Sequence, residues 1–174
     1  MRLYLSSFRM GDHPEHLTAL AGPAARTAVV IANAMDGAPH EVRRNAVGLE
    51  LTALADLGFT ARELDLRDYF GAAGEQRLRG DLSRAAVTWL RGGNTFVLRH
   101  ALARSGGDVV FRDLLAAGAN IVAVGQLGPH GVLTASIVTE PSVVRIELAG
   151  GPAKIRPSGC SADAITTAAI LAGG

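Results

Sequence analysis

Cysteine and lysine are nearly absent from this sequence of 174 residues. Cys160 is the single cysteine, which excludes a disulfide framework and a thiolate metal cluster. Lys154 is the one lysine among 17 basic residues, and the formal net charge is only +1. Because there is no basic tract, neither nucleic acid nor an acidic membrane surface is expected as a partner.

Long hydrophobic runs are missing as well. No apolar stretch approaches the length of a membrane span, and the apolar start of the chain is too short for a signal peptide. We therefore expect a cytoplasmic protein without a membrane partner. With 48% hydrophobic and 19% charged residues, the composition is typical of a globular protein, and the length predicts one domain over residues 1–174.

Short apolar segments bounded by turn residues predict strands over residues 3–5, 27–32, 59–66, 86–90 and 121–124. The pattern is weaker after residue 132, where residues 143–148 alternate like a strand and residues 154–156 are a further candidate. Segments with helical spacing alternate with these strands. Such alternation predicts an α/β fold, namely a three-layer α/β/α domain with a mostly parallel sheet.

The expected helices cover residues 15–20, 42–57, 96–103, 109–117 and 161–171, and residues 71–80 are expected to form a loop with a short helix. In the second helix, apolar residues at helical spacing are expected to face the sheet: Val47, Leu51 and Leu54. Arg43, Arg44 and Glu50 are placed on its outer side. Gly58 is expected to end that helix, and Asp108 to cap a later one.

Residues 87–96 join a strand, a tight turn and the start of a helix. Asn94 or Thr95 can cap that helix. In an open α/β sheet, ligands bind at the carboxyl ends of the strands. The backbone N–H groups of Gly92, Gly93 and Asn94 could therefore hold an anion or an oxyanion, although an ordinary loop would carry the same residues.

No metal or cofactor is expected. Gly125, Gly128 and Gly131 follow a strand, but their spacing does not fit a dinucleotide or phosphate loop. His13 and His16 lack a carboxylate-rich neighbourhood and are expected on the surface.

Several of these segments together resemble the peptidase S51 family, which includes peptidase E (aspartyl dipeptidase) and cyanophycinase. The resemblance rests on residues 3–7 with Met10 and Gly11, on residues 32–36, and most specifically on residues 89–98. It extends over residues 1–124, and the chain looks short in its C-terminal part. The resemblance implies a class I glutamine amidotransferase-like fold and a serine hydrolase that cleaves dipeptides.

The same resemblance implies where a Ser-His-Asp/Glu triad would lie. The nucleophile position falls at Gly125, the acid position at Glu140 and the histidine position at Ser158. Gln126 would complete the oxyanion and substrate-binding site together with Gly92, Gly93 and Asn94. Two of the three catalytic groups are thus absent from their expected positions.

Replacements for the missing groups are few. Ser161 lies in a segment, residues 159–163, that superficially resembles the nucleophile turn of the family. His130 could stand in as the base.

Three functions fit these observations. The chain could be a member of the family that has lost peptidase catalysis and binds a ligand or partner. It could be an active hydrolase that uses Ser161, or a structural subunit that pairs with an intact paralogue. The expected partners are a small peptide ligand and a second copy of the chain in a homodimer.

Overall fold

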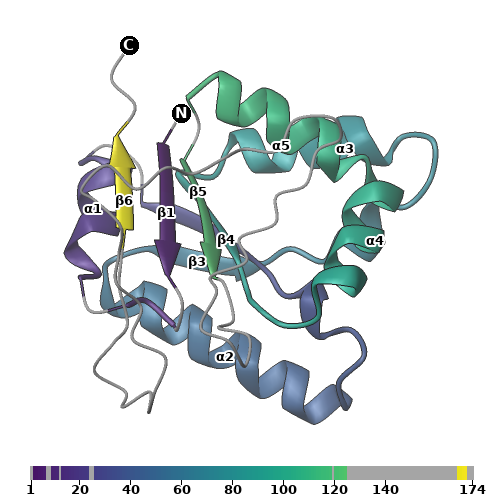
Figure 1. The fold of residues 1–174 in the computed structure, drawn as a ribbon, viewed down its shortest axis with the longest axis horizontal. Helices are drawn as coiled ribbons and strands as arrows, with labels where there is room; N and C mark the ends of the chain where they lie inside the picture. The colour runs from purple at the N-terminus through teal and green to yellow at the C-terminus, as the bar shows by residue number, and fades with distance from the viewer. Residues whose placement is uncertain are drawn as a thin grey trace, which may run out of the picture.

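The computed structural model describes residues 2–6, 9–11, 13–23, 26–118, 120–124 and 168–171. Strands and helices alternate along the described chain (Figure 1). The strands are β1 (Arg2–Ser6), β2 (Thr27–Ile31), β3 (Thr60–Glu63), β4 (Val87–Leu90), β5 (Asn120–Val124) and β6 (Ala168–Leu171). The helices are α1 (Glu15–Ala21), α2 (His40–Asp56), α3 (Gly74–Ser83), α4 (Thr95–Ser105) and α5 (Gly107–Ala116), with short 3-10 helices η1 (Asn33–Met35) and η2 (Leu66–Tyr69).

The described strands form one sheet in the order β3-β2-β4-β5-β1-β6. Neighbouring strands from β3 to β1 run parallel, and β6 pairs antiparallel with β1. In the centre, Leu90 of β4 is aligned with Ile31 of β2 and with Ala123 of β5. The predicted α/β class with a mostly parallel sheet is therefore confirmed.

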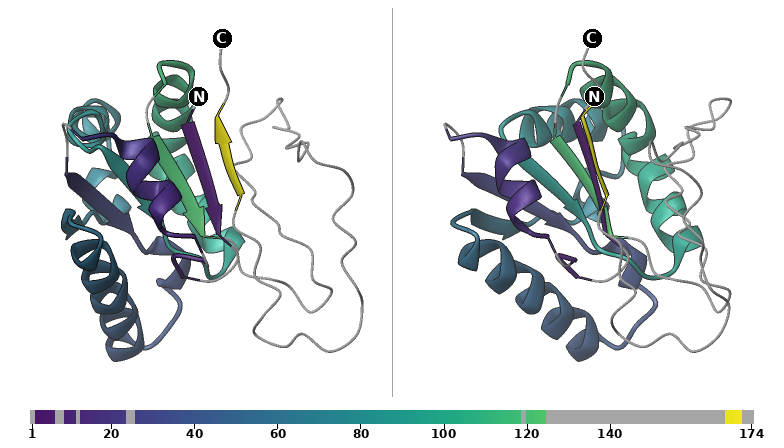
Figure 2. Two further views of the ribbon diagram at one scale, coloured as in Figure 1. Left: turned by 90° about the vertical axis from the view of Figure 1, so that its left-hand side faces the viewer. Right: turned by 60° about the vertical axis from the view of Figure 1, so that its left-hand side comes forward.

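Helices cover both faces of the sheet, which gives three layers (Figure 2). Side chains alternate along β2, so Val30 packs with Leu17 of α1 and Leu54 of α2. On the other face, Ile31 packs in the same cluster as Leu78 of α3. That cluster also includes residues of α4 and α5: Ala101, Leu102, Val110, Phe111 and Leu115.

The path of the chain changes face between β2 and β4. The chain leaves β2 towards α2 on one face, and it leaves β4 towards α4 on the other. In open α/β sheets, the place where neighbouring connections diverge in this way is where ligands bind. The fold therefore predicts a ligand site at the carboxyl ends of β2 and β4.

The outer side of α2 differs from the prediction. Val47 and Leu54 are buried as expected, but Glu50 is only 3% exposed and the Arg43 side chain only 12% exposed. Glu50 is buried and Arg43 is partly buried because each pairs with an opposite charge, which offsets the cost of removing it from water. Arg44 lies exposed, as predicted.

Three further expectations are corrected. Residues 168–171 form β6 instead of the end of a helix, because pairing with β1 outweighs the helix propensity of alanine. Residues 74–83 form the helix α3, which extends beyond the expected loop. Asp108 does not cap α5, because its side chain pairs with Arg99 and Gly106 occupies the cap position.

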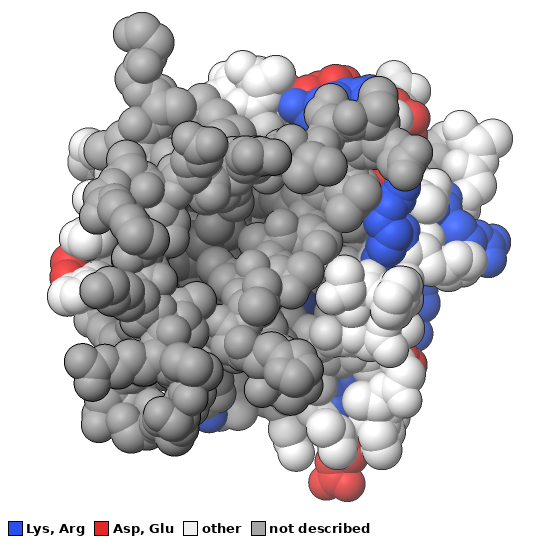
Figure 3. Space-filling view, in the orientation of Figure 1, with Lys and Arg blue, Asp and Glu red and all other residues white. Residues whose placement is uncertain are grey.

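Arginine and acidic side chains pair with one another on the surface near α3 and α5. Figure 3 shows arginine and acidic side chains next to one another on the side of the molecule where these helices lie. The pairs include Arg79 with Asp113 at 2.8 Å and Arg84 with Asp81 at 2.5 Å. These two arginines are matched by partly exposed carboxylates.

Candidate functional site

The turn from β4 to α4 is fixed against the exit of β2. The N–H of Arg91 donates to the carbonyl oxygen of Ile31 at 2.8 Å, and the N–H of Asn94 donates to that of Ala34 at 2.8 Å. A Cβ atom on Gly93 would lie 2.7 Å from the same Ala34 oxygen, so only glycine fits at this position. The two strand exits therefore pack directly on each other.

Asn94 caps α4 as the sequence predicts. Its Oδ1 accepts from the N–H groups of Phe96 at 3.0 Å and Val97 at 3.2 Å. Because its own N–H is bonded to Ala34, the contribution of Asn94 is to shape the turn and not to offer a donor. Within the described residues, no backbone acceptor is found for the N–H groups of Gly92 and Gly93, which precede the positive end of the helix.

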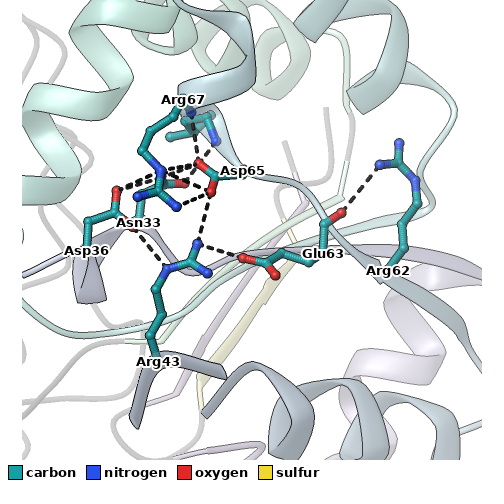
Figure 4. A network of polar contacts seen from close by, with 8 residues as sticks. Asn33, Asp36, Arg43, Arg62, Glu63, Asp65 and Arg67 are labelled. Atoms are coloured by element: carbon teal, nitrogen blue, oxygen red, sulfur yellow. Dashed lines mark hydrogen bonds and ion pairs between the residues drawn. The ribbon is translucent and has the colours of Figure 1, made fainter. Parts of the chain in front are cut away.

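A polar network holds the exit of β2 to the exit of β3 (Figure 4). The side-chain amide of Asn33 donates to Asp36 at 2.8 Å and to Asp65 at 2.9 Å, and its Oδ1 accepts from the N–H of Leu66. Arg43 of α2 contacts Asp36 at 3.0 Å and Asp65 at 3.3 Å. The network thereby fixes η1, the element that contains Ala34 and so supports the Gly93–Asn94 turn.

Asp65 is a shared acceptor in this network. Burial raises the pKa of its carboxyl group, but hydrogen bonds from Arg67 and Asn33 outweigh that effect and lower the pKa to about 2. Asp65 is therefore ionised at neutral pH, which suits a residue that accepts from two arginines and an amide.

A buried ion pair lies beneath the turn on the α2 side. Arg91 Nε lies 2.9 Å from Oε1 of Glu50, whose side chain is only 4% exposed. Burial raises the pKa of the Glu50 carboxyl group above its usual value, and the Arg91 guanidinium opposes this shift most strongly. Trp89 and Arg9 also lower the Glu50 pKa, so residues from the exits of β4 and β1 converge on one carboxylate.

From the sequence, Glu50 was predicted on the outer side of its helix, and Arg91 was not predicted to be a site residue. The spacing contained a signal, because Val47, Glu50 and Leu54 lie three and four residues apart and share one helix face. A charge inside an apolar stripe indicates a buried partner. The network around Asp65 had no such signal, since Asn33 and Arg43 are distant from it in the sequence.

The structure brings together only part of the expected site. Gly92, Gly93 and Asn94 lie at the carboxyl end of β4, next to β5. The other residues singled out from the sequence lie outside the described residues: Gly125, Gln126, His130, Glu140, Ser158, Cys160 and Ser161.

Neither a metal-binding cluster nor a membrane-spanning helix is found among the described residues. Over the described part of the chain, no group of three or more His, Cys, Asp or Glu side chains is arranged to hold a metal ion. None of the described helices is both long and apolar enough to cross a membrane.

Solved structures that are similar to this one include two peptidases. A putative peptidase E protein from Listeria monocytogenes EGD-e is 25% identical in sequence, with a TM-score of 0.55 over 72% of this chain and 57% of its own. A peptidase from an acI-B1 actinobacterium has a TM-score of 0.54 over 71% of this chain and 52% of its own. Its 13% identity shows a shared fold alone.

The chain thus spans little more than half the length of these two proteins. No protein-family model matches the sequence, and a search of curated proteins finds no match. The structural similarity confirms the resemblance to peptidase E-like proteins that residues 89–98 indicate in the sequence.

Proposed function

We propose that this chain binds small peptides at the carboxyl ends of β2, β4 and β5, and that it has lost the serine peptidase catalysis of peptidase E-like proteins. The observation that carries the proposal is the turn at Gly92–Gly93–Asn94. Its glycine N–H groups precede a capped helix, and Ala34 holds its backbone in place. A peptide carbonyl or carboxylate oxygen is the ligand such donors prefer.

The loss of catalysis follows from the residues at the implied triad positions. Gly125 has no side chain to act as a nucleophile, and Ser158 cannot replace the imidazole as a base at neutral pH. Loss of a nucleophile or base from a triad lowers the rate on the order of a millionfold, while binding by the remaining groups persists.

A binding assay beside a labelling assay tests this proposal. The purified chain is titrated with Asp-Leu by calorimetry, incubated with the same dipeptide to detect hydrolysis, and exposed to a fluorophosphonate probe. We expect saturable binding without hydrolysis or labelling. Labelling that disappears in Ser161→Ala would show an active hydrolase and overturn the proposal, as would the absence of any binding.

A partner subunit on the same fold is the second candidate. Phe96, next to the turn, is 87% exposed, and a large aromatic side chain at that place suits a protein contact. The proposed setting is the cytoplasm, with a second copy of the chain as partner. Native mass measurement that finds only monomer, alone and with an intact paralogue, would remove this candidate.

A further inference from the structure

Arg91 lies in an unusual position for a charged residue. It follows β4 directly, its side chain is 27% exposed, and its ion-pair partner Glu50 belongs to the core. Along β4 the side chains alternate, so Arg91 lies on the same face as Trp89, towards α2. The surface arginines described above are instead matched by partly exposed carboxylates.

Some N–H donors of the Arg91 guanidinium remain available for hydrogen bonds to a ligand. A guanidinium carries five N–H donors in a planar fork. Nε faces Glu50, and Nη1 lies 3.5 Å from the carbonyl oxygen of Gly92. Within the described residues, no hydrogen bond is found from Nη2. The outer N–H groups of the fork can therefore donate to the oxygens of a ligand carboxylate.

The local charge favours an anion. Arg9, which follows β1, also lowers the pKa of Glu50, although less than Arg91 does. Arg9 adopts a left-handed backbone with φ 45°, an uncommon conformation for a residue with a side chain. The hydroxyl of Tyr4 holds this loop by donating to the carbonyl oxygen of Met10 at 2.6 Å. β5 lies between β4 and β1, the two strands that precede these arginines in the sequence.

We propose that Arg91 recognises a carboxylate group of the ligand, and that Glu50 is the positioning residue that holds Arg91 beside the glycine turn. This inference rests on the proposed function, because it assigns ligand chemistry to the same site. The glycine N–H groups would donate hydrogen bonds to one polar group of the ligand, and the guanidinium would bind its carboxylate.

The test uses Trp89, which is the only tryptophan in the chain, is fully buried and lies beside Glu50. Its fluorescence is followed during titration with succinate, and with succinamide as the uncharged control. We expect a saturable change with succinate alone. Arg91→Ala should weaken succinate binding at least about tenfold, and Arg91→Lys less, because lysine keeps the charge but loses the fork. Arg112→Ala, on the exposed side of α5, should bind like the wild type.

Glu50→Gln separates positioning from charge. Removal of a negative charge alone would strengthen succinate binding, whereas loss of the Arg91 anchor weakens it. We expect a several-fold loss, in a variant whose urea unfolding shows that it is folded. Stronger binding would overturn the role of Glu50.

Two results would overturn the role of Arg91: no saturable response to succinate in the wild type, or an unchanged affinity in Arg91→Ala. Failure of the proposed function is read separately, from dipeptide hydrolysis or from the absence of dipeptide binding. If the wild-type chain hydrolyses dipeptides and Arg91→Ala loses succinate binding, the proposed loss of catalysis is wrong. The proposed recognition of a carboxylate by Arg91 would still be supported.

Discussion

At the scale of single residues, Asp65 does the most to connect the strand exits. Its two carboxylate oxygens accept from the Asn33 amide, from the Arg67 backbone and side chain, and from Arg43. Each donor comes from a different place in the chain, either beyond β2, in η2 or in α2. Hydrogen bonds to a charged acceptor are stronger than neutral ones, so this residue concentrates stabilising interactions at the edge that holds the site.

Asp65→Asn should lower the free energy of unfolding by about 2 kcal/mol at neutral pH. The pKa of Asp65 is depressed from 3.8 to about 2, so its contribution is complete above the unfolded value and is lost as pH falls through about 2. Urea unfolding from pH 7 down to pH 2 measures the difference between variant and wild type. Asp56→Asn, at the exposed end of α2, is the matched control with little expected effect.

The difference between Asp65→Asn and wild type should shrink towards the acid end of that series. A difference that stays constant down to pH 2 would contradict the ionised role of Asp65. A difference equal to that of Asp56→Asn at pH 7 would show that the network adds nothing to stability.

At the scale of elements, α4 is the helix on which the candidate site depends. It begins at the Asn94 cap and ends at Gly106, whose φ of 74° is readily adopted only by glycine. Its N-terminal end follows the glycine turn, so any fraying of the first turn would move the proposed donors.

Asn94→Ala should destabilise the protein by about 1 kcal/mol, because two N–H groups at the start of α4 lose their acceptor. Asn94→Asp should keep most of the stability, since a carboxylate also caps a helix and suits its positive end. Urea unfolding measures both variants. Asn45→Ala, at an exposed position within α2, serves as the control. Equal stability of Asn94→Ala and wild type would show that α4 starts without its cap.

The elements also show what the sequence can predict. Strands β2, β4 and β5 were predicted to within one residue, because apolar runs bounded by glycine or polar turns carry a local signal. Asn94 as a cap followed from its position before a helix. Asp108 is also a residue that commonly caps helices, but its carboxylate pairs with Arg99 of the preceding helix, and no local pattern contains that pairing. For the same reason the partners of Glu50 and Asp65 escaped prediction.

At the scale of the whole molecule, stability is concentrated in the middle of the sheet. All four residues of β4 are buried, and β4 pairs with strands on both sides. β3 is exposed or half-buried along its length and pairs only with β2 among the described strands. Opening of β3 therefore costs less free energy than opening of β4.

Hydrogen exchange followed by mass spectrometry should reveal this gradient. Backbone amides of residues 87–90 should exchange at least about tenfold more slowly than those of residues 60–63, which corresponds to about 1.4 kcal/mol of opening free energy. Equal protection of the two segments would indicate that the sheet opens as one cooperative unit.

The pairing of β1 has a consequence for synthesis of the chain. Leu3 is aligned with Ile121 of β5 on one side and with Ile170 of β6 on the other. β1 is thus translated well before both of its partners, so it stays unpaired until β5 and β6 have been synthesised. Meanwhile β2, β3 and β4 can already associate, since their contacts span shorter segments. The nascent chain must therefore keep its unpaired N-terminal strand away from other chains, and chaperones that shield extended apolar segments would act there first.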